Sequence, residues 1–149
     1  MPVARDVRCI TRRIVDAHPG VFTVDGYHAV ALNQDGTINS ASNPAPAGTD
    51  VTIFATGLGP VEPAQPDGAV MGFPLPGDVL VPVLTSVAPG IPILPGMPAS
   101  IPVEVRSAGA APLQVVGVSQ VTFVANGSGW PLSLTAGTGQ CWAHLFQGQ

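Results

Sequence analysis

Lysine is absent from the chain, and charged residues of all kinds make up only 9% of its 149 residues. Ordinary soluble proteins carry about 25%. Hydrophobic residues still account for 46% of the chain, so it can bury a core and is not a disordered polar segment. A lone soluble domain normally keeps apart from its neighbours through a charged surface. We therefore expect other subunits or attached glycans to cover much of this one.

Long apolar runs are also missing. No stretch reaches the ~20 apolar residues that a membrane span requires, and the start of the chain lacks the apolar core of a signal peptide. The sequence therefore predicts no membrane span. If the protein is secreted, its leader precedes Met1 or its export route is unusual.

Cysteine is scarce, with Cys9 and Cys141 near opposite ends of the chain. Metal sites usually need three or four ligands, so two cysteines suit one disulfide better. A bridge between them would hold the terminal strands together, either within one chain or between neighbours. The alternative is two buried free thiols, since free cysteine is often buried.

Constellations that support catalysis are not visible. His18, His28 and His144 are scattered, and none has metal-site spacing or a carboxylate pair beside it. Ser119 stands in the string 117–121, which lacks the second glycine of a nucleophile elbow. We expect no enzyme activity, no metal and no cofactor.

A calcium loop is an alternative interpretation of one polar stretch. Asn33, Asp35 and Asn39 place oxygen atoms at alternating positions around Gly36. A full loop needs a further bidentate acid, and the nearest one downstream, Asp50, lies beyond a proline turn. A hairpin explains these residues better, because Asp-Gly is a strong signal for a tight turn.

Glycine and proline, with 18 and 17 residues, punctuate the whole chain, and Val, Ile, Thr and Phe fill the gaps. This pattern favours many short strands over helices. Long loops are expected at 57–78 and 85–100. Segments of strand-like composition are 5–15, 21–24, 27–32, 37–39, 50–57, 79–84, 102–106, 113–124, 131–136 and 140–146.

About eight strands with turns between them predict an all-β, immunoglobulin-like β-sandwich with Greek-key connections and proline-rich loops. The alternation is clean in 50–57, where Val51, Ile53 and Ala55 share one face. We expect residues 17–149 to form this sandwich and residues 1–16 to form an N-terminal strand extension.

Charge is divided between a basic head and an acidic body. Four of the five arginines lie within the first thirteen residues, and Arg106 is the only later one. The basic run is short, and the acidic body would repel phosphates, so we expect no nucleic-acid binding. Docking of head on body fits better. The acids of the body are Asp16, Asp25, Asp35, Asp50, Glu62, Asp67, Asp78 and Glu104.

The head has the composition of a long strand, with β-branched residues and neither Gly nor Pro in 5–15. Such a strand can complete the sheet of another chain through main-chain hydrogen bonds. A head-to-tail contact of this kind does not close on itself and gives a filament. The alternative is that 5–15 is the first strand of its own sandwich. The expected assembly strand comprises Arg5, Val7, Arg8, Ile10, Arg12, Arg13 and Ile14.

Two features point to glycans. Asn126 begins the sequon Asn126-Gly127-Ser128 and is a candidate glycosylation site. Trp130 and Trp142 are candidates for stacking against a sugar, although both lie in strand-like stretches where a packing role is the more common one.

Several strings together resemble the uncharacterised Solibacter-type C-terminal domain family of secreted acidobacterial proteins. The resemblance covers about 17–147 and implies an extracellular immunoglobulin-like module with no assigned activity and no catalytic residues. This chain departs from the pattern in its proline-rich stretch around 85–100, where the family usually has a Gly-Gly hairpin, and in having little beyond the module. The strings are 17–23, 31–44, 55–60, 67–69, 108–112 and 117–121.

The sequence therefore predicts a non-catalytic extracellular or cell-surface structural protein that assembles with copies of itself into a filament. The alternative function is that of a carbohydrate-binding or surface-adhesion module.

Overall fold

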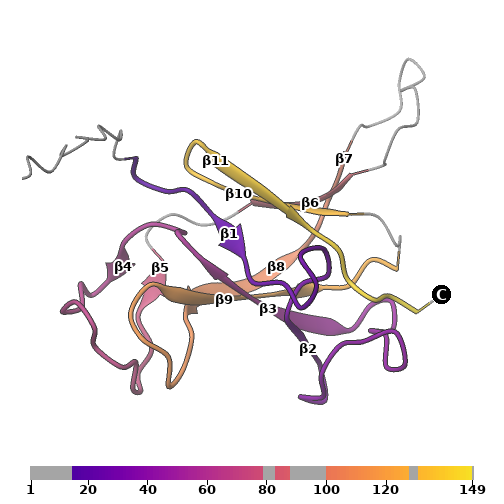
Figure 1. Ribbon diagram of the computed structural model, residues 1–149, viewed down its shortest axis with the longest axis horizontal. Coiled ribbons are helices and arrows are strands. Elements are labelled where there is room, and N and C mark those ends of the chain that lie inside the picture. The colour runs from indigo at the N-terminus through magenta and orange to yellow at the C-terminus, as the bar shows by residue number, and fades with distance from the viewer. Residues whose placement is uncertain (1–14, 79–82, 88–99, 128–130, 149) are drawn as a thin grey trace, which may run out of the picture.

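A computed structural model describes residues 15–78, 83–87, 100–127 and 131–148 of the chain. All regular structure in these ranges is β-strand, as Figure 1 shows, and they contain no helix that could cross a membrane. The strands are β1 (Gly20–Val21), β2 (Ala31–Asn33), β3 (Asp50–Thr56), β4 (Val61–Glu62), β5 (Gly77–Asp78), β6 (Val83–Val87), β7 (Ser100–Pro102), β8 (Val105–Ala110), β9 (Val118–Val124), β10 (Leu132–Ala136) and β11 (Gly139–Ala143).

The strands form two antiparallel sheets. The larger has the order β1-β3-β9-β8-β5-β4, and β2 also pairs with β3. β1 pairs with the end of β3 and β2 with its beginning, so these two short strands lie end to end along one side of β3. The smaller sheet has the order β11-β10-β6-β7 and lies above the larger one in Figure 1.

One apolar core lies between the sheets. The predicted alternation in β3 is confirmed, because Val51, Ile53 and Ala55 are buried. Val121 and Phe123 of β9 are buried beside them, and the smaller sheet contributes residues from β6 and β10. Each large apolar side chain buried in this way stabilises the fold by roughly 1.5 to 3 kcal/mol. The largest contributions of the smaller sheet come from Leu84, Leu132 and Leu134.

Residues 17–19 close one side of the molecule. The amide of His18 donates to the carbonyl oxygen of Gly57, 2.9 Å away. Gly57 has a φ of 70°, and a Cβ there would lie 2.2 Å from the carbonyl oxygen of His18. A Cβ on Gly139 would lie 2.5 Å from the Cδ of Pro19. Only glycine allows this segment to pass so close to both sheets.

Some predicted strands differ from the observed ones. The segment 113–124 begins as a turn, and β9 starts only at Val118. The segment 102–106 divides between β7 and β8, which belong to different sheets. The expected loop 57–78 holds two short strands. Of the strand expected at 79–84, residues 83–84 belong to β6, which continues to Val87 into the expected loop 85–100, and residues 79–82 and 88–99 lie outside the described ranges. Main-chain pairing with distant segments decides these boundaries, and composition does not report it.

The predicted Asp-Gly hairpin is present. The amide of Asn33 donates to the carbonyl oxygen of Thr37 at 2.8 Å, and that of Gly36 donates to the oxygen of Asn33 at 2.9 Å. Gly36 has a φ of 79°, which glycine tolerates without strain. The expected strand 37–39 is reduced to a single bridge between Leu32 and Ile38. The segment 5–14 lies outside the described residues.

Candidate interaction surface

The last described segment, 144–148, is held between two parts of the chain that lie far from it in the sequence. On one side, the amide of Ala29 donates to the oxygen of His144 and the amide of His144 to that of Tyr27, at 2.8 and 3.0 Å. On the other, the amide of Ala45 donates to the oxygen of Phe146 at 2.9 Å. The C-terminal segment therefore joins the loop between β1 and β2 to the segment around Ala45, which follows the Asp-Gly hairpin.

That loop turns around Asp25. Oδ1 of Asp25 accepts hydrogen bonds from the amides of Tyr27 and His28 at 2.9 and 2.6 Å, and Oδ2 lies 2.7 Å from Nδ1 of His28. The hydrogen bond from the His28 side chain, supported by the two amides, lowers the pKa of Asp25 to about 2. Asp25 therefore remains ionised in all but strongly acidic solution.

The turn positions Tyr27 and His28 so that each ring stacks on a ring of the C-terminal segment. The rings of Tyr27 and His144 lie 3.9 Å apart at 16°, and those of His28 and Phe146 lie 4.0 Å apart at 12°. Desolvation and the nearby charge of His28 lower the pKa of His144. The histidines are scattered in the sequence, yet the fold brings His28 and His144 within 6.3 Å. The one feature of the sequence that could have indicated these stacks is the His-x-Phe spacing of 144–146, because residues two apart in an extended segment place their side chains on the same face.

Three asparagines link the hairpin to the C-terminal segment. Nδ2 of the buried Asn39 donates to Oδ1 of Asn33 at 3.0 Å and to the oxygen of Phe146 at 2.8 Å. Oδ1 of Asn39 accepts from the amide of Phe146 at 3.0 Å. Nδ2 of Asn33 donates to the oxygen of Asn43 at 3.1 Å. The network therefore ties together segments that are remote in the sequence.

These hydrogen bonds occupy oxygen atoms that a calcium ion would need as ligands. Oδ1 of Asn33 and Oδ1 of Asn39 are committed to protein donors, and Oδ1 of Asp35 accepts from the hydroxyl and the amide of Thr37. The Thr37 hydroxyl lowers the pKa of Asp35. A hollow of about 480 Å³ lies beside these residues. Across the four described ranges, no group of three or more His, Cys, Asp or Glu could hold a metal ion.

An apolar surface covers part of the outer face of the larger sheet, on the side away from the core. A hollow of about 470 Å³ is lined there by Phe22, Thr23, Val30, Phe54, Gln114 and Val118. Phe22 is exposed, and Val30, Phe54 and Val118 are half-buried. We call these four apolar residues the sheet half of the apolar strip.

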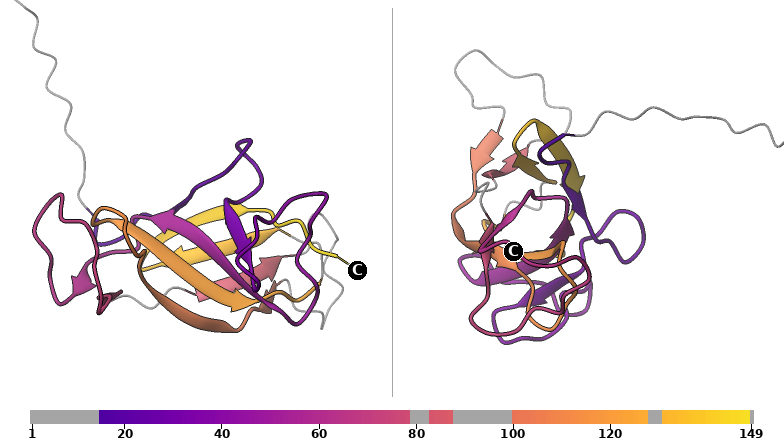
Figure 2. Two further views of the ribbon diagram at one scale, coloured as in Figure 1. Left: turned by 90° about the horizontal axis from the view of Figure 1, so that it is seen from below. Right: turned by 90° about the vertical axis from the view of Figure 1, so that its left-hand side faces the viewer.

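The strip continues onto two adjacent loops. Val70 and Val115 face each other in an antiparallel bridge, and the amide of Met71 donates to the oxygen of Gln114 at 2.8 Å. Figures 1 and 2 show these loops together at the end of the molecule that carries β4. Val70, Phe73, Leu113 and Val115 form the loop half of the strip, and they are 63%, 79%, 76% and 51% exposed.

Leu113 holds an unusual backbone conformation within the loop half. Its φ is 59°, and no other non-glycine residue in the described ranges has a positive φ. It is the third residue of a turn in which the amide of Gln114 donates to the oxygen of Ala111 at 3.4 Å. Glycine or asparagine is usual at this position. A large apolar side chain is therefore presented to solvent at a conformational cost.

Acidic side chains accompany the strip. Glu62 and Asp67 belong to the segment that leads to Val70, and both are exposed. Arg106, the one lysine or arginine in the described ranges, is engaged elsewhere, bonded to Glu104 and 3.6 Å from Asp50. Within those ranges Glu62 and Asp67 have no ion-pair partner.

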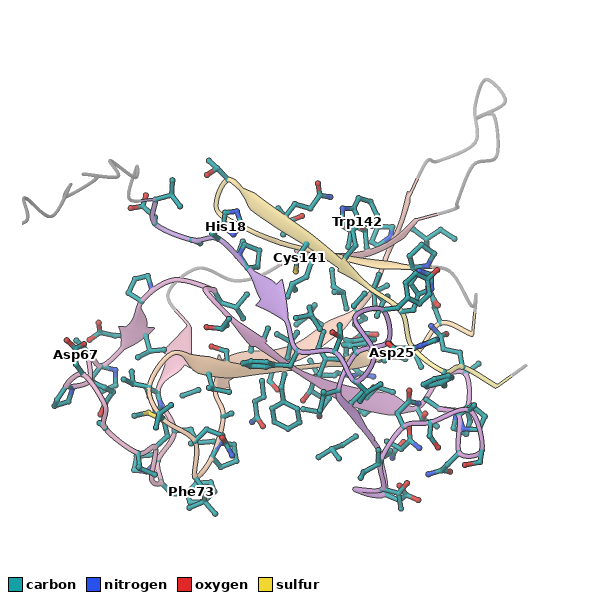
Figure 3. All side chains as sticks on the ribbon, in the orientation of Figure 1. His18, Asp25, Asp67, Phe73, Cys141 and Trp142 are labelled. Carbon is teal, nitrogen blue, oxygen red and sulfur yellow. The ribbon has the colours of Figure 1, made fainter. Side chains whose placement is uncertain are left out.

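The structure places only some of the predicted site residues. Cys141 lies on β11, half-buried beside Val21, and desolvation raises the pKa of its thiol. Trp142 is 53% exposed on the same strand, and Asn126 is exposed just after β9. Figure 3 shows Trp142 and Phe73 on opposite sides of the molecule. The residues that lie outside the described ranges are Cys9, Trp130, Arg5, Val7, Arg8, Ile10, Arg12, Arg13 and Ile14.

Comparison with known proteins adds no relative. No family model matches the chain, and neither a curated protein nor a solved structure matches it. Inference about function therefore rests on the chain's own surfaces.

Proposed function

We propose that the chain is a non-catalytic extracellular structural subunit that assembles head-to-tail into a filament through its N-terminal strand. The observation that carries the proposal is the apolar strip, where Val70, Phe73 and Leu113 are each more than 60% exposed. Large apolar patches on soluble proteins usually mark interaction sites. Because only 9% of the residues are charged, repulsion between charged surfaces does little to keep such a patch away from neighbouring molecules.

The fold we propose is an immunoglobulin-like sandwich with Greek-key connections. In that fold one sheet holds strands A, B, E and D, and the other holds C, F and G. The strand orders support the assignment of β3, β9 and β8 as B, E and D, and of β6, β10 and β11 as C, F and G. Membership of the Solibacter-type domain family is part of the same proposal and rests on the strings described above.

Charge supports a contact between head and body. Residues 1–14 carry four arginines and one acid, whereas the rest of the chain carries one arginine and eight acids. Complementary charge speeds association and sets orientation more than it adds affinity. It therefore favours a head-to-tail joint over contacts between two like surfaces.

Negative-stain electron microscopy of the non-reduced protein at several concentrations tests the proposal. We expect filaments with a regular repeat that lengthen with concentration and are lost when residues 1–14 are deleted. The deletion leaves the described sheets complete, so circular dichroism should confirm that the shortened chain is folded. Isolated particles from the full chain at every concentration would contradict the proposal.

A carbohydrate-binding or adhesion module is the second candidate. The observation that favours it is the exposed Trp142 on β11, which stands two residues before His144 in the sequence. The ring of His144 in turn stacks on the ring of Tyr27. Side chains two apart on a strand share a face, and exposed aromatic rings can stack on sugars. This candidate predicts a monomer whose binding to glycans disappears in Trp142→Ala and persists in Phe73→Ala, which removes another exposed ring on the opposite side. A glycan on Asn126 is compatible with either function, and mass spectrometry of the native protein would detect it.

A further inference from the structure

We propose that the apolar strip is the acceptor for the N-terminal segment, residues 5–14, of the next copy of the chain. This inference rests on the proposed filament function and specifies the surface that the N-terminal segment occupies, which is the outer face of the larger sheet with its adjacent loops and not a sheet edge. It assigns a binding role to both halves of the strip, from the hollow at Phe22 and Phe54 to the exposed Leu113.

Burial is the first argument. The N-terminal segment carries three large apolar side chains, those of Val7, Ile10 and Ile14. Each square ångström of apolar surface removed from water contributes about 25 cal/mol. In an extended segment Ile10 and Ile14 share one face and Val7 lies on the other, so docking of that face on the strip removes the apolar surface of two of these side chains, and of the strip beneath them, from water.

Strain at Leu113 is the second argument. Its φ of 59° places a leucine where glycine or asparagine is usual, and its side chain is 76% exposed. Backbone strain of this kind tends to persist at functional sites. A docking role explains why this position has a leucine. The exposed side chain adds little to the stability of the free monomer, but it supplies apolar surface for a docked segment.

Charge is the third argument. The segment brings four arginines, and residues 15–149 carry eight acids against one arginine. Glu62 and Asp67 are exposed in the segment that leads to Val70 of the strip, and they have no ion-pair partner within the described ranges. Both carboxylates are therefore available to pair with the arginines of a segment that docks on the strip.

The segment is long enough to reach the strip of a neighbouring copy. Fourteen extended residues span up to about 46 Å, enough to cross to an adjacent molecule. Val15 and Asp16 line a hollow with Thr56 and Gly117, beside the Val118 of the strip. This starting point lies beside the segment's own strip as well, so the choice of the neighbour's strip follows from the proposed head-to-tail filament, and cross-linking distinguishes the two.

Disulfide trapping in the full-length chain tests this placement. In a Cys141→Ser background, Val115→Cys places one thiol on the strip, and the natural Cys9 supplies the other. Trp142→Cys in the same background is the matched control, because Trp142 is 53% exposed and Val115 is 51% exposed on a different face. We expect mild oxidation to give a ladder of covalent multimers from Val115→Cys alone, and Cys9→Ser to abolish it.

Other outcomes overturn the placement in distinguishable ways. A cross-linked monomer from Val115→Cys would put the segment on its own strip. An equal ladder from Trp142→Cys, or filaments by microscopy without any ladder from Val115→Cys, would place the acceptor elsewhere while the filament function stands. The absence of both filaments and ladders would reject the filament function as well.

Discussion

Leu113 combines a left-handed backbone conformation with an exposed apolar side chain, and the two have separate effects on stability. A left-handed conformation costs a residue other than glycine roughly 1 to 2 kcal/mol, and glycine loses about 0.5 to 1 kcal/mol through its freer unfolded chain. We expect Leu113→Gly to raise the free energy of unfolding by up to about 1 kcal/mol, because the lost side chain is 76% exposed. Urea denaturation of unassembled protein measures this change.

The matched control for this substitution is Leu113→Ala. Alanine keeps the strained backbone and loses the side chain, so the free energy of unfolding should hardly change. Both variants should assemble less well than the wild type if the side chain docks. A lower stability of Leu113→Gly would show that the φ of 59° carries little strain at this turn.

His144 gives the fold a dependence on pH. Desolvation, with the charge of His28, lowers its pKa, so the folded state binds the proton less well than the unfolded chain. The stabilising contribution is therefore present above the unfolded pKa of about 6.5 and is lost as pH falls through the lower folded value. We expect His144→Phe, which keeps a ring against Tyr27, to lose less stability between about pH 8 and about pH 5 than the wild type.

Denaturant midpoints of both proteins at the two pH values measure the difference. His18 remains in the variant, and it is not among the groups that act on His144, so its contribution is common to both chains. The interaction between the charges of His28 and His144 is lost with the imidazole and is part of the difference measured. Equal losses of stability in the two proteins would mean that His144 takes up its proton as readily in the folded state as in the unfolded chain.

At the scale of elements, Asn39 joins the hairpin to the C-terminal segment. Its side chain bonds to Asn33 and to both the amide and the oxygen of Phe146. Asn39→Ala leaves Oδ1 of the buried Asn33 and the half-buried amide of Phe146 without this partner, whereas the oxygen of Phe146 keeps its bond from the amide of Ala45. Each buried group left unpaired costs roughly 1 to 3 kcal/mol. We expect a loss of about 2 to 4 kcal/mol in the free energy of unfolding, measured by urea denaturation.

Asn43→Ala is the matched control, because Asn43 is exposed and its side chain bonds only within the hairpin. Its loss should stay under about 1 kcal/mol. Similar losses in the two variants would mean that the bonds to Phe146 add little to the fold.

The elements also show what could be predicted from the sequence. The alternation of 50–57 predicts β3 and its buried face, because that strand is long and covered on one side. The composition of 113–124 places the start of β9 too early, since pairing with the 69–73 segment turns residues 113–116 into a loop. The stacks around His28 and His144 could not be predicted, because they require remote segments to meet, and a single sequence does not report which segments pair.

At the scale of the whole molecule, the charge separation could be predicted from composition, but the acceptor could not. Exposure of Leu113 and Phe73 depends on which loops the sheet leaves uncovered, and composition alone does not distinguish exposed from buried apolar residues. The structure adds that Arg106 is already engaged by Asp50 and Glu104. The body therefore presents acids that its own described cation does not neutralise.

Assembly should accordingly respond to charge at two acids. Glu62→Gln combined with Asp67→Asn removes both negative charges beside the strip, and we expect slower and weaker filament growth with a smaller response to salt. Exposed ionic contacts are screened over about 8 to 10 Å at moderate salt, so wild-type growth should slow as salt rises. Light scattering against time at several salt concentrations measures both effects.

The control carries the same change of net charge at other positions. Ala41→Arg combined with Thr138→Arg adds two positive charges at exposed turns away from the strip. If general repulsion between acidic bodies limits growth, this control should speed it as much as the loss of Glu62 and Asp67, and local pairing with the arginines would then be wrong. If the acids beside the strip receive the basic head, only their removal slows growth, because a charge-assisted joint depends on where the charges lie as well as on their sum.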